Sequence, residues 1–311
     1  MSIFDAIIQG IVQGLTEFLP VSSSGHLAIT QHIMGVTENN LFFNVMLHIG
    51  TLVAVVAFYY KLIIRLVKEF FALIKDIFTG KFKWKEMNND RRMLFMIVIG
   101  LLPLFLLFLP VPGTGMNIKD FAEVFSGDEK YFIIVGFSLL ITSVLLIVGN
   151  KLNNKLIAKA EKDGTLSELG AGKQSLTVVD AIVVGLVQCC AAVFPGLSRS
   201  GSTLAAGQMR GVNRQTAFDY TFILAIPSIL AAAVLELSDA LSAPEGITIS
   251  IGAIIFGMIA AAVVGYLSIV LFKWLLKTNK MYVFIIYTAV VGIAVIAVSI
   301  VEMNIGHNIF V

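Results

Sequence analysis

The chain has 311 residues, of which 58% are hydrophobic and only 14% are charged, and its mean hydropathy is +0.91. Soluble domains carry roughly 25% charged residues, so the composition excludes an ordinary soluble enzyme and predicts an integral membrane protein. The net charge of +2 gives no sign of nucleic-acid binding, and the sequence contains no nucleotide-binding loop, zinc signature or dinucleotide fingerprint.

The first apolar stretch contains polar residues that are unusual at membrane depth. Gln13 and Glu17 are four residues apart, which places them on one face of a predicted helix. Pro20 ends that helix, and the hydroxyl-rich loop Ser22 to Gly25 leads into a second one whose first turn carries His26. Ionisable groups within a bilayer are costly and therefore indicate function.

Six later runs are long enough for the roughly 20 residues of a membrane-spanning helix. We expect spanning helices at Leu41–Tyr60, Met93–Pro110, Tyr131–Asn150, Gln215–Leu237, Thr248–Phe272 and Met281–Val301. The segment from Lys61 to Arg92 holds nine Lys and Arg residues. We interpret this segment as an interfacial amphipathic element attracted to anionic lipid.

The distribution of Lys and Arg among the loops predicts the orientation. These residues are concentrated in 61–92, 151–173 and 273–280, and they are scarce in 111–130, 238–248 and the tail from Glu302. The positive-inside rule places the first group in the cytoplasm and both termini outside. This orientation requires residues 3–35 and 178–211 each to enter the membrane and return to the side from which they came. The chain leaves the first of these segments at an external turn from Thr37 to Asn40.

The two re-entrant segments are related in sequence. Asp5 to Pro20 aligns without gaps with Asp180 to Pro195, and seven of sixteen positions are identical. We therefore expect one all-α membrane domain over 1–311, with six spanning helices and two re-entrant helix-loop-helix hairpins in an inverted-topology repeat. Its parts are repeat one at 1–150 with its hairpin at 3–35, a cytoplasmic linker at 151–177, and repeat two at 178–311 with its hairpin at 178–211. The site of such proteins lies where broken helices meet near mid-membrane.

The loop after Pro195 carries the most specific motif, PGLSRSGST. Its glycines allow close approach of backbone to an anion, its hydroxyls donate, and Arg199 matches phosphate oxygens. We predict catalytic roles for Glu17, His26, Ser23 and Arg199. We predict substrate binding by Gln13, Ser22, Ser24, Gly25, Ser198, Ser200, Gly201 and Thr203.

Each of these residues also has a purely structural interpretation. The serines are ordinary helix N-caps, His26 could be a buried core histidine, and Arg199 could pair with Glu17 as a structural bridge. Asn44 and His48 share a helix face, and we weigh roles behind the site or in substrate entry against simple helix–helix hydrogen bonding. The sequence leaves three candidates for the nucleophile, which are Ser23, His26, and a water activated by Glu17 and His26.

On these residues the chain resembles the undecaprenyl-diphosphatase family, also called the bacitracin-resistance family. The family's N-terminal signature, an acidic or Gln residue separated by three residues from a Glu, is matched by Gln13 and Glu17. Its SSSGH-type loop is matched by Ser22 to His26, and its PGxSRSGxT signature by Pro195 to Thr203. Some members carry a carboxylate where this chain has Gln13, which argues against a metal held between two acids.

The resemblance implies hydrolysis of undecaprenyl diphosphate to the monophosphate and phosphate in the bacterial plasma membrane, which recycles the cell-wall lipid carrier and confers bacitracin resistance. It implies a site open to the external side and a divalent cation, Mg²⁺ or Ca²⁺, which we expect to arrive bound to the diphosphate near Gln13 and Glu17. The expected partners are the polyprenyl diphosphate, membrane lipids and a second copy in a homodimer. The alternative from the inverted repeat is a polyprenyl-phosphate flippase or an anion transporter.

Overall fold

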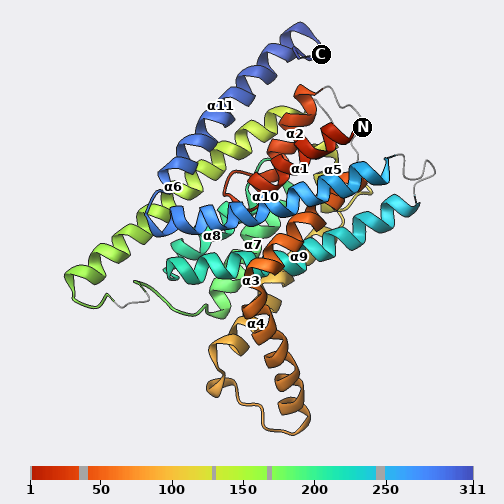
Figure 1. Cartoon of the computed structure of the whole chain (residues 1–311). Coiled ribbons are helices and arrows are strands. Elements are labelled where there is room, and N and C mark those ends of the chain that lie inside the picture. Colours follow the sequence, from red (N-terminus) through yellow and green to blue (C-terminus); the bar gives the residue numbers. More distant parts are fainter. Residues whose placement is uncertain (1, 35–40, 128–130, 167–169, 243–248, 311) are drawn as a thin grey trace.

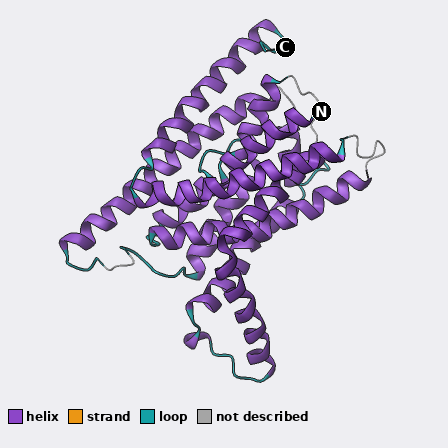
Figure 2. Ribbon diagram, in the orientation of Figure 1, coloured by secondary structure: helices purple, strands orange, loops and turns teal. Residues whose placement is uncertain are grey.

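The computed structural model describes residues 2–34, 41–127, 131–166, 170–242 and 249–310, and these residues form helices and no β-strand (Figures 1 and 2). The elements in chain order are α1 (Ile3–Phe18), α2 (Ser23–Ile33), α3 (Leu41–Phe78), η1 (Trp84–Glu86), α4 (Asn89–Leu101), η2 (Leu102–Phe108), α5 (Ile118–Gly127), α6 (Phe132–Lys162), α7 (Val178–Val193), α8 (Arg199–Met209), α9 (Arg214–Ser242), α10 (Ile251–Lys277) and α11 (Tyr282–Ile305).

Six of these helical segments are long and apolar enough to cross a membrane, which confirms the predicted class of all-α membrane protein. They are Phe42–Phe78, Asn89–Phe108, Phe132–Lys162, Arg214–Leu235, Ile251–Lys277 and Tyr282–Ile305. The first differs from the expectation, because α3 does not end at Tyr60 but continues to Phe78. The predicted turn from Thr37 to Asn40 lies outside the described residues.

The two hairpins predicted to be re-entrant have the same internal plan. α1 and α7 both have 16 residues, and α2 and α8 both have 11. Both first helices begin with a capping box, made by Ser2 with Asp5 and by Thr177 with Asp180. A helix of 16 residues is about 24 Å long, so neither reaches across the hydrocarbon layer of about 30 Å.

The hairpins also pack against equivalent partners. α1 lies along α10, where Gly10 meets the backbone of Gly257, and α7 lies along α4, where Gly185 meets the backbone of Gly100. A Cβ atom on Gly10 or Gly185 would collide with the facing carbonyl oxygen in either case. This agreement supports the repeat, whereas the opposite orientation of its halves in a membrane stays a prediction.

The rest of the bundle positions the ends of the hairpins. α6 and α11 pack together as a long pair (Figure 1), and α8 packs between α6 and α7. Buried aromatic rings at Phe18, Phe218, Phe222 and Phe272 connect the end of α1 to α9 and α10. This aromatic core closes one side of the space between the two hairpin loops.

Candidate active site

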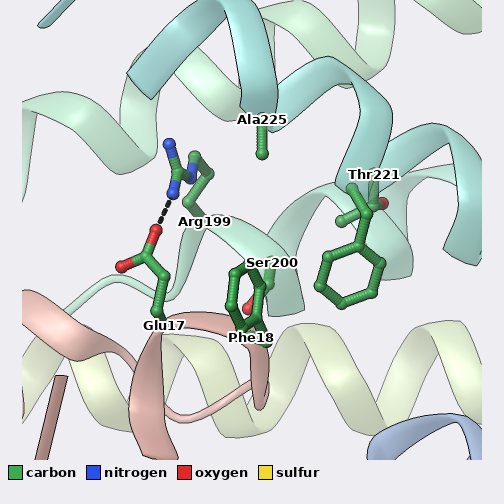
Figure 3. A pocket seen from close by; sticks show the side chains of 7 residues that line it. Glu17, Phe18, Arg199, Ser200, Thr221 and Ala225 are labelled. Atoms are coloured by element: carbon green, nitrogen blue, oxygen red, sulfur yellow. Dashed lines mark hydrogen bonds and ion pairs between the residues drawn. The ribbon is translucent and has the colours of Figure 1, made fainter. Parts of the chain in front are cut away.

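Glu17 is the centre of the polar cluster between the hairpins. Its side chain, in the last turn of α1, is 1% exposed. Oε2 accepts hydrogen bonds from Ser23 Oγ at 2.5 Å and from Gln13 Nε2 at 2.9 Å. Oε1 accepts from the Arg199 guanidinium, which comes from the start of α8 (Figure 3). The structure thus brings together an acid, an amide and a hydroxyl from one hairpin with a guanidinium from the other.

The first loop is held by its own hydroxyls. Ser22 is the N-cap of α2, accepts from Gly25 N–H at 3.2 Å, and has a positive φ of 74°. Such a backbone is unfavourable for a serine and tends to occur at functional sites. Ser24 Oγ accepts from Gly196 N–H at 3.3 Å, so this hydroxyl is bonded to the second hairpin.

The second loop has the same construction. Ser198 is the N-cap of α8 and accepts from Gly201 N–H at 3.1 Å. Ser200 Oγ donates to Leu19 O at 3.1 Å, back to the first hairpin. Thr203 Oγ1 donates to Arg199 O at 2.8 Å. Ser198, Gly201 and Thr203 thus have structural partners here, and their part in substrate binding stays a prediction.

Gly196 has a packing reason to be glycine. Its φ is +88°, and a Cβ atom there would lie 2.6 Å from Val135 O. The close approach of this loop to α6 is stabilised by Ser198 N–H, which donates to Thr142 Oγ1 at 3.0 Å. The loop that carries Arg199 therefore rests on the backbone of α6.

Two histidines, His26 and His48, use the same ring nitrogen to bond a backbone carbonyl four residues earlier. His26 Nδ1 lies 2.7 Å from Ser22 O, and His48 Nδ1 lies 2.7 Å from Asn44 O. A carbonyl oxygen only accepts, so Nδ1 carries the proton in both rings and Nε2 is left for other partners. His48 Nε2 lies 3.6 Å from Glu17 Oε2, which is attractive when the imidazole is protonated. The structure therefore places His48 beside the acid, a location that sequence reasoning had left open.

Tyr287 on α11 was not anticipated from the sequence. Its hydroxyl lies 2.7 Å from His26 Nε2, and the two rings are stacked with centroids 5.5 Å apart. Because Nδ1 holds the proton of the neutral ring, the tyrosine hydroxyl is the donor in this bond. Tyr287 stands in a continuous apolar run, where no sequence signal distinguishes it from a lipid-facing aromatic residue.

Thr221 on α9 is a second unanticipated residue. It is buried, and its Oγ1 has no hydrogen-bond partner among the described residues. It lines a cavity together with Glu17, Phe18, Arg199, Ser200, Phe222 and Ala225 (Figure 3). A buried hydroxyl without a partner among the described residues, on a residue that lines this cavity, is a candidate to donate to a bound oxyanion.

The cavity is small in this structure. Its volume is about 10 Å³, which leaves room for about one water molecule. The Glu17–Arg199 ion pair runs along its edge (Figure 3). A diphosphate therefore requires this pair to separate, which would free the guanidinium for phosphate oxygens and the carboxylate for a proton.

A divalent cation can be tested against the donors present. No group of three His, Cys, Asp or Glu side chains suitable for a metal occurs in the part of the chain that the structure describes. Gln13 Oε1, however, is a buried acceptor without a partner there. Hard cations prefer such oxygens, so Gln13 Oε1 and the Glu17 carboxylate are donors that suit a cation, and its binding stays a prediction.

Comparison with known proteins identifies the family of the chain. The family model described as "Bacitracin resistance protein BacA" matches residues 6–294. A protein named "Undecaprenyl-diphosphatase" from Alkaliphilus metalliredigens is 38% identical over 96% of this chain and 99% of its own length. Proteins of the same name from Methanosphaera stadtmanae and Bacteroides fragilis are 35% and 37% identical over 97% and 96% of this chain, and 99% of each relative is covered. The chain belongs to the bacitracin resistance protein BacA family.

Proposed function

We propose that this protein is a membrane phosphatase that hydrolyses undecaprenyl diphosphate to undecaprenyl phosphate and phosphate. The observation that carries the proposal is the buried Glu17 carboxylate, which is bonded by Arg199 from one hairpin and Ser23 from the other. The names of the relatives support the same activity. The lipid tail would remain in the bilayer while the diphosphate enters between the hairpins.

The geometry favours Ser23 among the three nucleophiles. Its hydroxyl already donates to Glu17 at 2.5 Å, which is the arrangement of a nucleophile and its base. Ser23 Oγ attacks the terminal phosphorus, Glu17 takes the hydroxyl proton, and the bond from this phosphorus to the bridging oxygen breaks. Undecaprenyl phosphate leaves, and water then attacks the phosphoserine to release phosphate and restore the hydroxyl.

Arg199 would supply the electrostatic part of the reaction. Phosphoryl transfer depends mostly on positioning and on stabilising charge at the phosphate oxygens. After separating from Glu17, the guanidinium can bind two of these oxygens side by side. Thr221 and the first two residues of α8, Arg199 and Ser200, line the same cavity, and the N-terminus of a helix favours anions. Gln13 and Glu17 would hold a Mg²⁺ or Ca²⁺ ion that offsets the diphosphate charge when it is bound.

We also infer the arrangement in the membrane. The inverted repeat with both termini outside is supported by the distribution of Lys and Arg. The opening of the site to the external side of the plasma membrane is what the family resemblance implies. The equal lengths of the helices in the two hairpins support the repeat itself. One domain over 1–311 is the natural unit, because each hairpin packs against a helix of the other repeat.

The test is release of phosphate from undecaprenyl diphosphate by the purified protein in detergent. Glu17→Ala and Arg199→Ala should each abolish release while the protein elutes as a folded species. Glu161→Ala, on the exposed end of α6, is the matched control and should leave turnover unchanged. Turnover that survives in either site variant would refute the site. Transfer of lipid across vesicles without any phosphate release would support the transporter alternative instead.

A further inference from the structure

The α3–α4 hairpin, defined here as residues 60–92, stands away from the rest of the helices (Figure 1). α3 has 38 residues, and a helix of that length extends about 57 Å, nearly twice the hydrocarbon thickness of about 30 Å. The helical geometry is interrupted at Tyr59, where φ is −100° and ψ is 15°. The second half of α3 therefore continues past the membrane-spanning half in a changed direction.

One face of this second half is apolar and uncovered. It is formed by exposed side chains at spacings of four, three, four and seven residues, which lie on the same side of a helix. They are Tyr60, Ile64, Val67, Phe71 and Phe78. Phe71 is 64% exposed and Phe78 is 86% exposed, and the exposed residues Phe70 and Ile77 widen the face on one side.

A row of lysines borders the other side of this face. Lys61, Lys68 and Lys75 are seven residues apart and exposed, so they lie one above the other along the helix. None of the three forms an ion pair with a described residue. The row therefore presents uncompensated positive charge beside apolar surface.

The acidic residues of the same helix are on its far side, where α4 covers them. Glu69 and Asp76 both bond Arg91, at 3.2 Å and 2.7 Å, and Arg65 bonds Asp90 at 3.0 Å. These pairs fix α4 against the polar side of α3. They leave the apolar face and the lysine row pointing away from the hairpin.

The apolar face continues the lipid-facing surface of the membrane-spanning half. Val53 and Val56 are exposed there, and the series from Val53 through Val56 to Tyr60 keeps the helical spacing into the hairpin. A second copy of the chain would cover this apolar face less well than lipid does. In a paired coiled coil the lysine row would have no acidic row to face, because the opposite border consists of Phe70, Ile77 and Ile63.

We propose that the α3–α4 hairpin lies on the membrane surface and binds anionic lipid, with its apolar face at the acyl boundary and Lys61, Lys68 and Lys75 on the headgroups. A wide apolar stripe bordered by lysines is the pattern of interfacial helices. Anionic headgroups attract each such lysine within about a Debye length, roughly 8 Å at physiological salt. The lipid bound here is a structural partner, separate from the substrate.

The test uses fluorescence of a single tryptophan in the full-length protein reconstituted into vesicles. The native Trp84 and Trp274 are replaced by Phe, and the reporter is Phe71→Trp on the apolar face. Bromine atoms on the acyl chains quench a tryptophan that touches them. We expect strong quenching by brominated phosphatidylglycerol in phosphatidylcholine vesicles and weaker quenching when only the phosphatidylcholine is brominated. The matched reporter Ala72→Trp, about 100° further round the helix, should be quenched weakly in both.

The lysines are tested in the same reporter protein. Replacing Lys61, Lys68 and Lys75 together by Gln should remove the extra quenching by phosphatidylglycerol, as should high salt. The control replaces Lys151, Lys155 and Lys159, three exposed lysines on α6, and should keep the effect. Both triple variants should release phosphate at the normal rate. Equal quenching at positions 71 and 72, or crosslinking of Phe71→Cys between copies in a background without Cys189 and Cys190, would overturn the proposal.

Discussion

Ser23 and Arg199 occupy the same position in the two hairpins. Each is the first residue of its helix and follows an N-cap serine, and each bonds one oxygen of Glu17. The repeat has thus given one position two chemistries, a hydroxyl in the first copy and a guanidinium in the second. One carboxylate therefore has a nucleophile on one oxygen and a cation on the other.

The first prediction concerns the attacking atom. Ser23→Ala should lower phosphate release by at least about 100-fold, because it removes the hydroxyl that Glu17 activates. Ser24→Ala is the control, since Ser24 Oγ bonds Gly196 and not the carboxylate, and it should lose much less. If Ser23→Ala retains most of its activity, attack by His26 or by water becomes the better mechanism.

The second prediction concerns the guanidinium. Arg199→Lys preserves the charge but not the planar pair of donors, so it should reduce kcat by about 100-fold, as loss of a transition-state donor does. The measurement is steady-state phosphate release at saturating substrate. Arg210→Lys is the parallel control, because Arg210 lies at the other end of α8 and bonds Asp180. Full activity in Arg199→Lys would mean that charge alone suffices.

The third prediction concerns the ring of His26. Tyr287→Phe removes the hydroxyl that donates to His26 Nε2. Loss of one hydrogen bond of about 1 kcal/mol should lower kcat about fivefold, while KM changes little. Tyr282→Phe changes an exposed tyrosine on the same helix and should have no effect. Should Tyr287→Phe be faster than the unaltered protein, the tyrosine instead blocks a nitrogen that the reaction uses.

The fourth prediction concerns packing of the hairpins. Gly10→Ala and Gly185→Ala would each push a methyl group into a facing backbone oxygen, and each should destabilise the protein by about 2 kcal/mol or more. Gly252→Ala is the control, because its methyl group would meet only Ile3 Cδ1, at 3.6 Å. This substitution should be neutral or slightly stabilising. Thermal unfolding in detergent measures all three. Equal melting temperatures across the set would contradict the close packing of α1 on α10 and α7 on α4.

The fifth prediction concerns acid stability. Asp180 lies outside the six membrane-spanning segments. Burial raises the pKa of its carboxyl, but hydrogen bonds from Lys173, Thr177 and Arg210 outweigh burial and lower the pKa from 3.8 to about 2. A carboxyl whose pKa is lower in the folded state than in the unfolded state stabilises the folded protein, and this stabilisation is complete at pH values above the unfolded pKa. The contribution of Asp180 to the free energy of unfolding is therefore lost as the pH falls from about 4 to about 2.

The melting temperature should therefore fall over this pH range, and Asp180→Asn should show a smaller fall from a lower starting value. Asp163→Asn, at an exposed position after α6, serves as the comparison and should follow the unaltered protein. An unchanged pH profile in Asp180→Asn would show that another group controls acid unfolding.

The sequence predicted those parts of the fold that depend on local hydrophobicity. Long apolar runs located all six spanning segments, although Asp219 interrupts one of them. The end of α3 was missed because Lys61 interrupts the apolar run while the helical pattern continues to Phe78. The short helix α5 was not expected either, because its residues, Ile118–Gly127, include several charges.

The sequence was less informative about the site, for a physical reason. Gln13, Glu17 and Ser23 lie within one hairpin, so their proximity follows from helical spacing and a short loop. His48 comes close to Glu17, and Tyr287 to His26, only through the packing of α3 and α11, which depends on tertiary contacts that a single sequence does not display.

Each loop of the site is completed by the other hairpin, since Ser24 accepts from Gly196 and Ser200 donates to Leu19. Neither half of the chain alone, cut within the linker between α6 and α7, contains a finished catalytic centre. A protein molecule whose two halves fail to pack together during membrane insertion therefore has no phosphatase activity. It does not become an unselective phosphatase in the cell envelope. Co-expression of the two halves as separate polypeptides would restore phosphate release only to the extent that the two polypeptides associate in the bilayer.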